Sequence, residues 1–263
     1  MAEEKLRLGG MALSNGVLVH GPSAWACAVR LESGELRVAS GHKRLRASKV
    51  EEPLLRGPAR LFEALALLPE LKRKLPEARL AFERRRVLGT MLACAAPVRA
   101  VRESARIRPV LREALSGLLA LAPALVALRG SELSGYHGAE HVAIGTYEHG
   151  EERGKEHERC GSHLVGPLLL TTAVGNLLAA RAPVHLRGLA RGLAGLGALA
   201  ASTEIFAWMV RHPDAPVSRA LARPGHELQH RLATATPTPE QLEVAQTALQ
   251  ECLRLEHDAD NSG

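Results

Sequence analysis

Long apolar stretches are the feature that most constrains how this chain of 263 residues folds. A helix needs about 20 mostly apolar residues to cross a bilayer, with about 17 as a lower limit. The stretches Leu164 to Ala180 and Gly192 to Val210 reach that length, whereas Val87 to Val98 and Ala114 to Leu128 are shorter. We therefore expect a mainly α, polytopic helical membrane protein, with a soluble helical bundle as the alternative.

Prolines and arginines mark the ends of these stretches. Pro97, Pro123 and Pro167 lie inside them or at their ends, and arginines flank the first two. Arginine side chains can snorkel from a helix end to the membrane interface, so short, kinked or re-entrant segments are compatible with this pattern. Basic residues are frequent both in the connection after the first apolar stretch and in the one after the last. The positive-inside rule therefore leaves the orientation of the protein in the membrane open.

The charge pattern favours lipid over nucleic acid as a partner. The formal net charge is +6, and the basic residues, 28 Arg and 6 Lys, are spread along the chain. Aromatic residues make up only 3%, which leaves almost no surface on which a nucleic-acid strand can stack. We expect membrane lipid as a partner and no nucleic acid. A substrate or protein partner and the oligomeric state stay open.

Composition divides the chain into four parts. Residues 1–52 carry glycine-rich turns and a predicted β-hairpin, in which WACAVRL and LRVAS flank the turn ESGE. Residues 53–86 form a basic, amphipathic helical segment with leucines on one face. Residues 87–210 form the membrane helical domain, which contains the histidine-rich loop 135–163. Residues 211–263 form a polar C-terminal segment.

An amphipathic helix is predicted over residues 239–255. Thr238 as N-cap, Pro239 at the first helical position and Gln241 three residues after the cap are typical of a helix start. The apolar face that follows comprises Leu242, Ala245, Leu249, Cys252 and Leu253.

The sharpest chemical signal is His137-Gly-Ala-Glu140-His141, which has the form H-x-x-E-H, a metal-binding pattern. On a helix, histidines four residues apart point the same way and can share a cation. Glu140 stays on the same side, near any water bound to the metal, where a carboxylate acts as general base.

A second pair of candidate ligands follows. His157 and Cys160 extend the pattern to H-x3-H-x15-H-x2-C, the layout of a four-ligand structural zinc site. In that version four side chains close a tetrahedron, and Glu140 has no water to face. In the catalytic version two or three of them bind and one position stays open. The third alternative is a histidine-rich surface without metal.

Glu204 is a candidate extra ligand for the catalytic version. It lies in the fourth apolar stretch, where an ionisable side chain is costly and marks a functional candidate. A hydrogen-bonded carboxyl facing the bundle interior is the equally weighted alternative. The four cysteines are far apart and form no CxxC, so we expect no disulfide framework.

Six blocks of this sequence resemble the YqhQ-like bacterial membrane proteins, a family of unknown function described as predicted metal-dependent enzymes. The blocks are GGMALSNGVLVHGP (9–22), PLLRGPARLFEAL (53–65), GYHGAEH (135–141), TYE (146–148), HERCGS (157–162) and PGHELQHRLATATPTPEQLEVAQTAL (224–249). The resemblance implies a multi-pass protein of the bacterial cell membrane with a small N-terminal β element. It also implies a metal site built from the GYHGAEH and HERCGS blocks.

Carried over by position, the resemblance supports the residues that the motifs single out. These are His137, Glu140, His141, His157 and Cys160, with Glu148 and Glu204 as weaker additions. The family usually has a glutamate where this chain has Asn15, so any acidic role there is lost. The segment between TYE and HERCGS is also shorter than the family pattern. No substrate follows from the resemblance.

These observations lead to one functional hypothesis and one rival. The hypothesis is a membrane enzyme that holds a divalent cation, zinc from its ligand types, and hydrolyses an amide or peptide. The substrate class rests on analogy with H-x-x-E-H peptidases. The rival is a non-enzymatic membrane scaffold or regulator in which four ligands close a structural zinc site.

Overall fold

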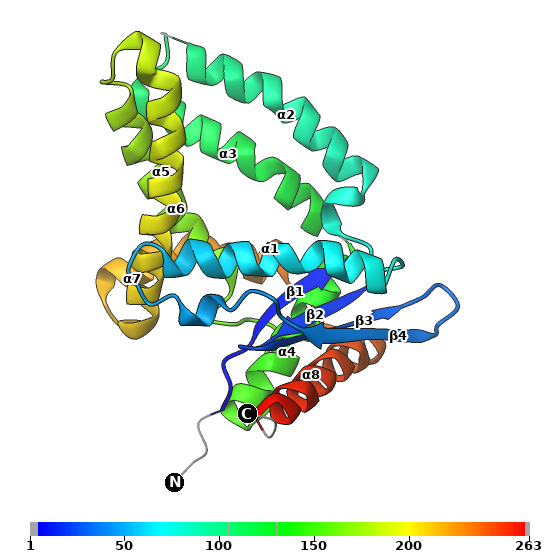
Figure 1. Ribbon diagram of the computed structural model, residues 1–263. Helices are drawn as coiled ribbons and strands as arrows, with labels where there is room; N and C mark the ends of the chain where they lie inside the picture. Colours follow the sequence, from blue (N-terminus) through cyan, green and yellow to red (C-terminus); the bar gives the residue numbers. More distant parts are fainter. Residues whose placement is uncertain (1–4, 105, 130, 261–263) are drawn as a thin grey trace.

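A computed structural model describes residues 5–104, 106–129 and 131–260, and places a small β-sheet beside a set of long helices (Figure 1). The four strands pair antiparallel in chain order: β1 (Gly9–Leu13), β2 (Gly16–His20), β3 (Ala24–Arg30) and β4 (Leu36–His42). The predicted hairpin is confirmed as β3 and β4. The sequence did not predict β1 and β2, since these strands are five residues each and the first begins with two glycines.

Eight α-helices follow in the described part of the chain. They are α1 (Arg56–Lys74), α2 (Arg85–Glu103), α3 (Pro109–Leu128), α4 (Glu132–His149), α5 (Val165–Ala179), α6 (Arg187–Arg211), α7 (Pro216–Leu228) and α8 (Pro239–Asp260). The helix predicted over 239–255 is confirmed and continues to Asp260. Its start has the expected reciprocal bonds, 3.1 Å from Thr238 N to Gln241 Oε1 and 3.3 Å from Gln241 N to Thr238 Oγ1.

The alternation of side chains along the strands places apolar residues on both faces of the sheet. One face, with Val17, Val19, Ala26 and Ala28, packs on α4 and α8. The other face, with Leu18, Trp25 and Cys27 among its members, packs on α1. Because both faces are covered, the sheet is the core of the polar half of the molecule, and α4 is fixed against it.

Three segments are long and apolar enough to cross a membrane: Leu111–Leu128, Gly161–Ala179 and Val184–Arg211. The third and fourth apolar stretches of the sequence therefore correspond to candidate spans. The second stretch also qualifies, because α3 begins at Pro109 and adds residues ahead of the stretch read from composition. The first stretch, in α2, is not among the candidates in the described part of the chain.

The candidate spans expose most of their apolar side chains. Only 11%, 22% and 17% of the residues in the three windows are buried, and Leu118, Leu193 and Leu196 are each at least 60% exposed. Exposing this much apolar surface to water is unfavourable in free energy, whereas exposing it to lipid is not. Figure 1 shows α2, α3, α5 and α6 on one side of α1, with the sheet, α4 and α8 on the other. This separation is consistent with membrane localisation.

We predict that the protein stays in the pellet when a membrane fraction is washed with alkaline carbonate. Carbonate strips proteins held by charge, whereas helices whose apolar side chains lie in hydrocarbon are retained. Immunoblotting of the pellet and the supernatant measures the outcome. Recovery of the protein in the soluble fraction would show that another apolar surface, and not lipid, covers these helices.

Candidate metal centre

Helix α4 carries the H-x-x-E-H motif and is the most enclosed helix of the described chain, with eleven buried residues among its eighteen. It packs beside α8 on one face of the sheet, and it ends at Gly150, whose φ of 77° is the left-handed conformation that glycine favours at a helix end. The helical spacing therefore places His137 and His141 on one side of a rigid element, as the motif predicts.

Backbone carbonyls from two other segments fix the orientation of both histidines. His137 Nδ1 lies 2.9 Å from the carbonyl oxygen of Ala233, and His141 Nδ1 lies 2.7 Å from that of Lys155. A carbonyl oxygen only accepts, so in each neutral ring the proton is on Nδ1 and the lone pair is on Nε2. Metal-binding histidines are held in this way by their second nitrogen.

The sulfur of Cys160 faces the same point. Cys160 Sγ lies 3.5 Å from His137 Nε2 and accepts a 3.5 Å hydrogen bond from the Ser162 amide. One ligand atom from each of His137, His141 and Cys160 lies within 4.8 Å of the other two. Two imidazoles and a thiol are donor types that zinc prefers. The structure thus brings three of the residues singled out in the sequence into one group.

His157 is outside this group, although it lies next to it. Its Nδ1 accepts a 3.2 Å hydrogen bond from the Arg159 amide, so its Nε2 donates to Glu148, 3.2 Å away. Both ring nitrogens are therefore engaged, and the ring centre is 5.6 Å from that of His141. Burial acts to raise the pKa of Glu148, but the bond from His157 and the Arg159 guanidinium hold it below its ordinary value.

Glu204 is also outside the group. Its carboxylate accepts two hydrogen bonds from the Arg56 guanidinium, of 2.8 and 2.5 Å, and a third from the Leu54 amide at 3.2 Å. Paired bonds of this kind are specific in direction and stronger than neutral ones. Glu204 therefore joins α6 to α1 in this structure. A hydrogen-bonded carboxyl within the fold is the alternative that the sequence offered to a role as a metal ligand.

Glu140 lines a cavity of about 430 Å³ that His137, His141 and Cys160 also border. The side chain is only 7% exposed, and among the described residues none donates a hydrogen bond to its carboxylate. A Cβ on Gly10 would lie 2.3 Å from that carboxylate, so the edge strand β1 reaches it only through a glycine. Burial raises the pKa of Glu140, and the nearby His137 and His157 oppose that rise.

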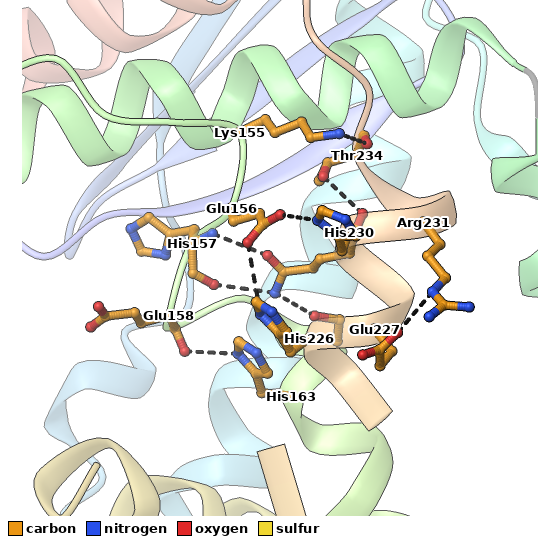
Figure 2. A network of polar contacts seen from close by, with 12 residues as sticks. Lys155, Glu156, His157, Glu158, His163, His226, Glu227, His230, Arg231 and Thr234 are labelled. Carbon is orange, nitrogen blue, oxygen red and sulfur yellow. Dashed lines mark hydrogen bonds and ion pairs between the residues drawn. The ribbon is translucent and has the colours of Figure 1, made fainter. Parts of the chain in front are cut away.

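The loop that carries Cys160 is held against the turn after α7 (Figure 2). This π-helical turn, Gln229–Ala233, supplies the carbonyl that orients His137. Gln229 is 1% exposed; it accepts from the His157 amide at 3.0 Å and donates to the His157 carbonyl at 3.2 Å and to Ser162 Oγ at 2.7 Å. Figure 2 also shows Lys155 reaching the Thr234 carbonyl, a bond of 3.1 Å.

Motif reading did not single out Gln229. The signal available was the block PGHELQHRLATATPTPEQLEVAQTAL, which contains it, but a glutamine without a ligand-type pattern around it carries no prediction. Its role follows from burial and from three bonds to one loop.

We predict that Gln229→Leu loosens the loop from Lys155 to Cys160. The change removes three hydrogen bonds and leaves buried partners unsatisfied, so amide hydrogen exchange at His157 should accelerate about tenfold or more. Gln241→Leu is the matched control, because Gln241 is also buried, at 8% exposed, but bonds to Thr238 and Glu132. Unchanged exchange at His157 in the Gln229 variant, or equal acceleration in both, would contradict the role assigned to Gln229.

The region that holds this site is the region that resembles known proteins. Residues 131–255 match the family model "Protein of unknown function (DUF1385)". The chain is 36% identical over 132 residues to "Uncharacterized protein YqhQ" of Bacillus subtilis (strain 168). These similarities support a YqhQ-like, uncharacterised family. The match covers 46% of this chain and 40% of the length of that relative, and no solved structure matches.

Proposed function

We propose that the chain is a membrane-bound, zinc-dependent hydrolase in which His137, His141 and Cys160 bind the metal and Glu140 is the general base. The observation that carries the proposal is the pair of carbonyl bonds that leave the Nε2 lone pairs of His137 and His141 unused in a group that includes the Cys160 thiol. Membrane lipid is the partner expected for the candidate spans.

The donor set supports a site with an open position. Catalytic zinc takes three protein ligands and leaves one position for water or substrate, whereas structural zinc takes four protein ligands. Zinc bound in this way lowers the pKa of its water to about 7 and polarises a substrate carbonyl. His157 is the sequence's fourth candidate, and its ring nitrogens are bound to Arg159 and Glu148.

The chain's own residues supply the rest of the chemistry. Glu140 takes a proton from the attacking water at its free carboxylate and passes it to the leaving group. Leu8, Met11 and Ile144 give the cavity an apolar wall that limits access of bulk water. An amide or peptide remains the first choice of substrate, by analogy with other H-x-x-E-H enzymes.

A non-enzymatic scaffold with a structural zinc site is the second candidate. The thiol ligand favours it, because sites made entirely of nitrogen and sulfur donors are more often structural. That function requires a fourth ligand, and the candidate from the sequence is His157, which would have to rotate away from Glu148. The two candidates therefore differ in what His157 and Glu140 do.

We predict that the purified protein binds one zinc ion, and that His137→Gln, His141→Gln or Cys160→Ser abolishes binding. His157→Gln and Glu204→Gln are the matched controls and should retain one zinc, since neither side chain faces the three-residue group. Elemental analysis after dialysis against trace zinc measures the stoichiometry. If His157→Gln also released the metal, the closed four-ligand site would be correct.

We predict that Glu140→Gln retains the zinc but lowers activity at least about 100-fold, the usual contribution of a general base. Because the substrate is unidentified, activity is first measured as rescue of a strain that lacks the gene, at matched protein levels. Peptide-library cleavage by the purified protein is the second readout. Full rescue by the variant would leave Glu140 without a catalytic role and favour the scaffold.

A further inference from the structure

A histidine from the sheet, His20, also lines the cavity that holds the candidate metal site. His20 is the last residue of β2 and pairs with Gly9 of the edge strand β1, one residue before the Gly10 that faces Glu140. A Cβ on Gly9 would lie 2.7 Å from His20 Cε1 and Nε2, so the ring lies over the edge strand where that strand has no side chain. His20 and Glu140 thus border one cavity of about 430 Å³ from the two faces of β1.

A buried ion pair fixes the tautomer of His20. Lys43 Nζ lies 3.0 Å from His20 Nδ1 and 2.8 Å from Glu63 Oε2, and the side chains of Lys43 and Glu63 are only 2% and 7% exposed. The Ala47 amide donates to the other oxygen of Glu63 at 2.7 Å. An ammonium group only donates, so His20 Nδ1 accepts and the neutral ring carries its proton on Nε2.

The same surroundings keep the ring neutral. Burial lowers the pKa of His20 to about 4, and the Lys43 ammonium adds to this effect, while the Glu63 carboxylate opposes it. Among the described residues Lys43 is the one side chain hydrogen-bonded to this ring, and the Gly21 backbone is a further partner, so a molecule in the cavity would take over the Nε2–H donor from that backbone contact. Burying an ion pair costs desolvation free energy. Despite this cost, the Lys43–Glu63 pair has a function here, which is to hold the neutral imidazole of His20 in one tautomer.

We infer that His20 is a catalytic residue of the proposed hydrolase, and that its Nε2–H donates a hydrogen bond to the carbonyl oxygen of a neutral acyl substrate such as an amide. A fixed neutral donor stabilises the charge that develops on this oxygen in the transition state, and it needs no rearrangement to do so. A neutral imidazole gives little attraction to a permanent anion, so the site should prefer an uncharged acyl group to a phosphate. The inference rests on the proposed function.

The probe for this inference is acetohydroxamate, which chelates zinc through its carbonyl oxygen and its N–O oxygen; the carbonyl oxygen can still accept a hydrogen bond while it is bound. Full-length, zinc-loaded protein with ¹⁵N-labelled histidine is studied in detergent micelles, and His20 is assigned by comparison with His20→Gln. We expect a neutral ring with the proton on Nε2, and a shift of that signal when acetohydroxamate is added. Inorganic phosphate should cause a smaller shift.

Variants separate a direct contact from a structural role. His20→Phe keeps the ring volume without a donor and should weaken acetohydroxamate binding about tenfold, with the zinc content unchanged. His20→Gln keeps a neutral N–H donor and should bind within about threefold of the wild type. The paired change Lys43→Met with Glu63→Gln removes the ion pair without leaving a lone buried charge, and His20 should then show both tautomers.

These outcomes separate a failure of the proposed function from a failure of the role assigned to His20. A wild-type protein that binds no zinc overturns the proposed function and this inference with it. A zinc-loaded protein whose His20 signal ignores acetohydroxamate, with His20→Phe binding it as well as the wild type, overturns the inference alone. A larger response to phosphate than to acetohydroxamate overturns the assignment of a neutral acyl substrate. If His20→Phe does not fold, the wild-type spectra and His20→Gln still decide.

Discussion

Two hydrogen bonds to backbone carbonyls, from His137 to Ala233 and from His141 to Lys155, determine what this site can do. They place the protons on Nδ1 and leave both Nε2 lone pairs unused, with the thiol of Cys160 in the same group. One carbonyl belongs to the loop that follows α4, and the other to the turn after α7, 96 residues from His137 in the chain. The site therefore exists only while the loop before Cys160 and the turn after α7 stay packed on α4, which is what Gln229 and the Lys155 side chain secure.

The arrangement of the polar and apolar halves gives the site its surroundings. The sheet, α4 and α8 form a core in which both faces of the sheet are covered, and the candidate spans lie on the other side of α1 (Figure 1). The cavity lies between these parts, since its wall includes the edge strand β1 and Leu128 at the end of α3. An enzyme of this construction would act on a substrate at the boundary between lipid and water.

The sequence predicts the parts of the site that depend on local spacing. The helical period predicts that His137, Glu140 and His141 lie on one side of α4. The spacing of ligand-type residues predicts that Cys160 belongs to the same group. Both predictions use only distances along the chain. The same spacing also includes His157. The direction of its ring depends on Glu148 and Arg159, and a sequence motif does not predict these contacts. Glu204 in an apolar stretch suggests a functional site, but its partner is an arginine from α1. His20 and Gln229 have no ligand-type pattern around them, and the roles that we assign to them rest on tertiary contacts.

X-ray absorption at the zinc edge tests the central claim most directly, because it counts the ligands around the metal and identifies their elements. A zinc ion held by His137, His141 and Cys160 should have one sulfur neighbour at about 2.3 Å and three nitrogen or oxygen neighbours at about 2.0–2.1 Å, of which two are imidazoles. The spectrum of His157→Gln should be the same as that of the wild type. A third imidazole that disappears in that variant, or a site without sulfur, would contradict the account.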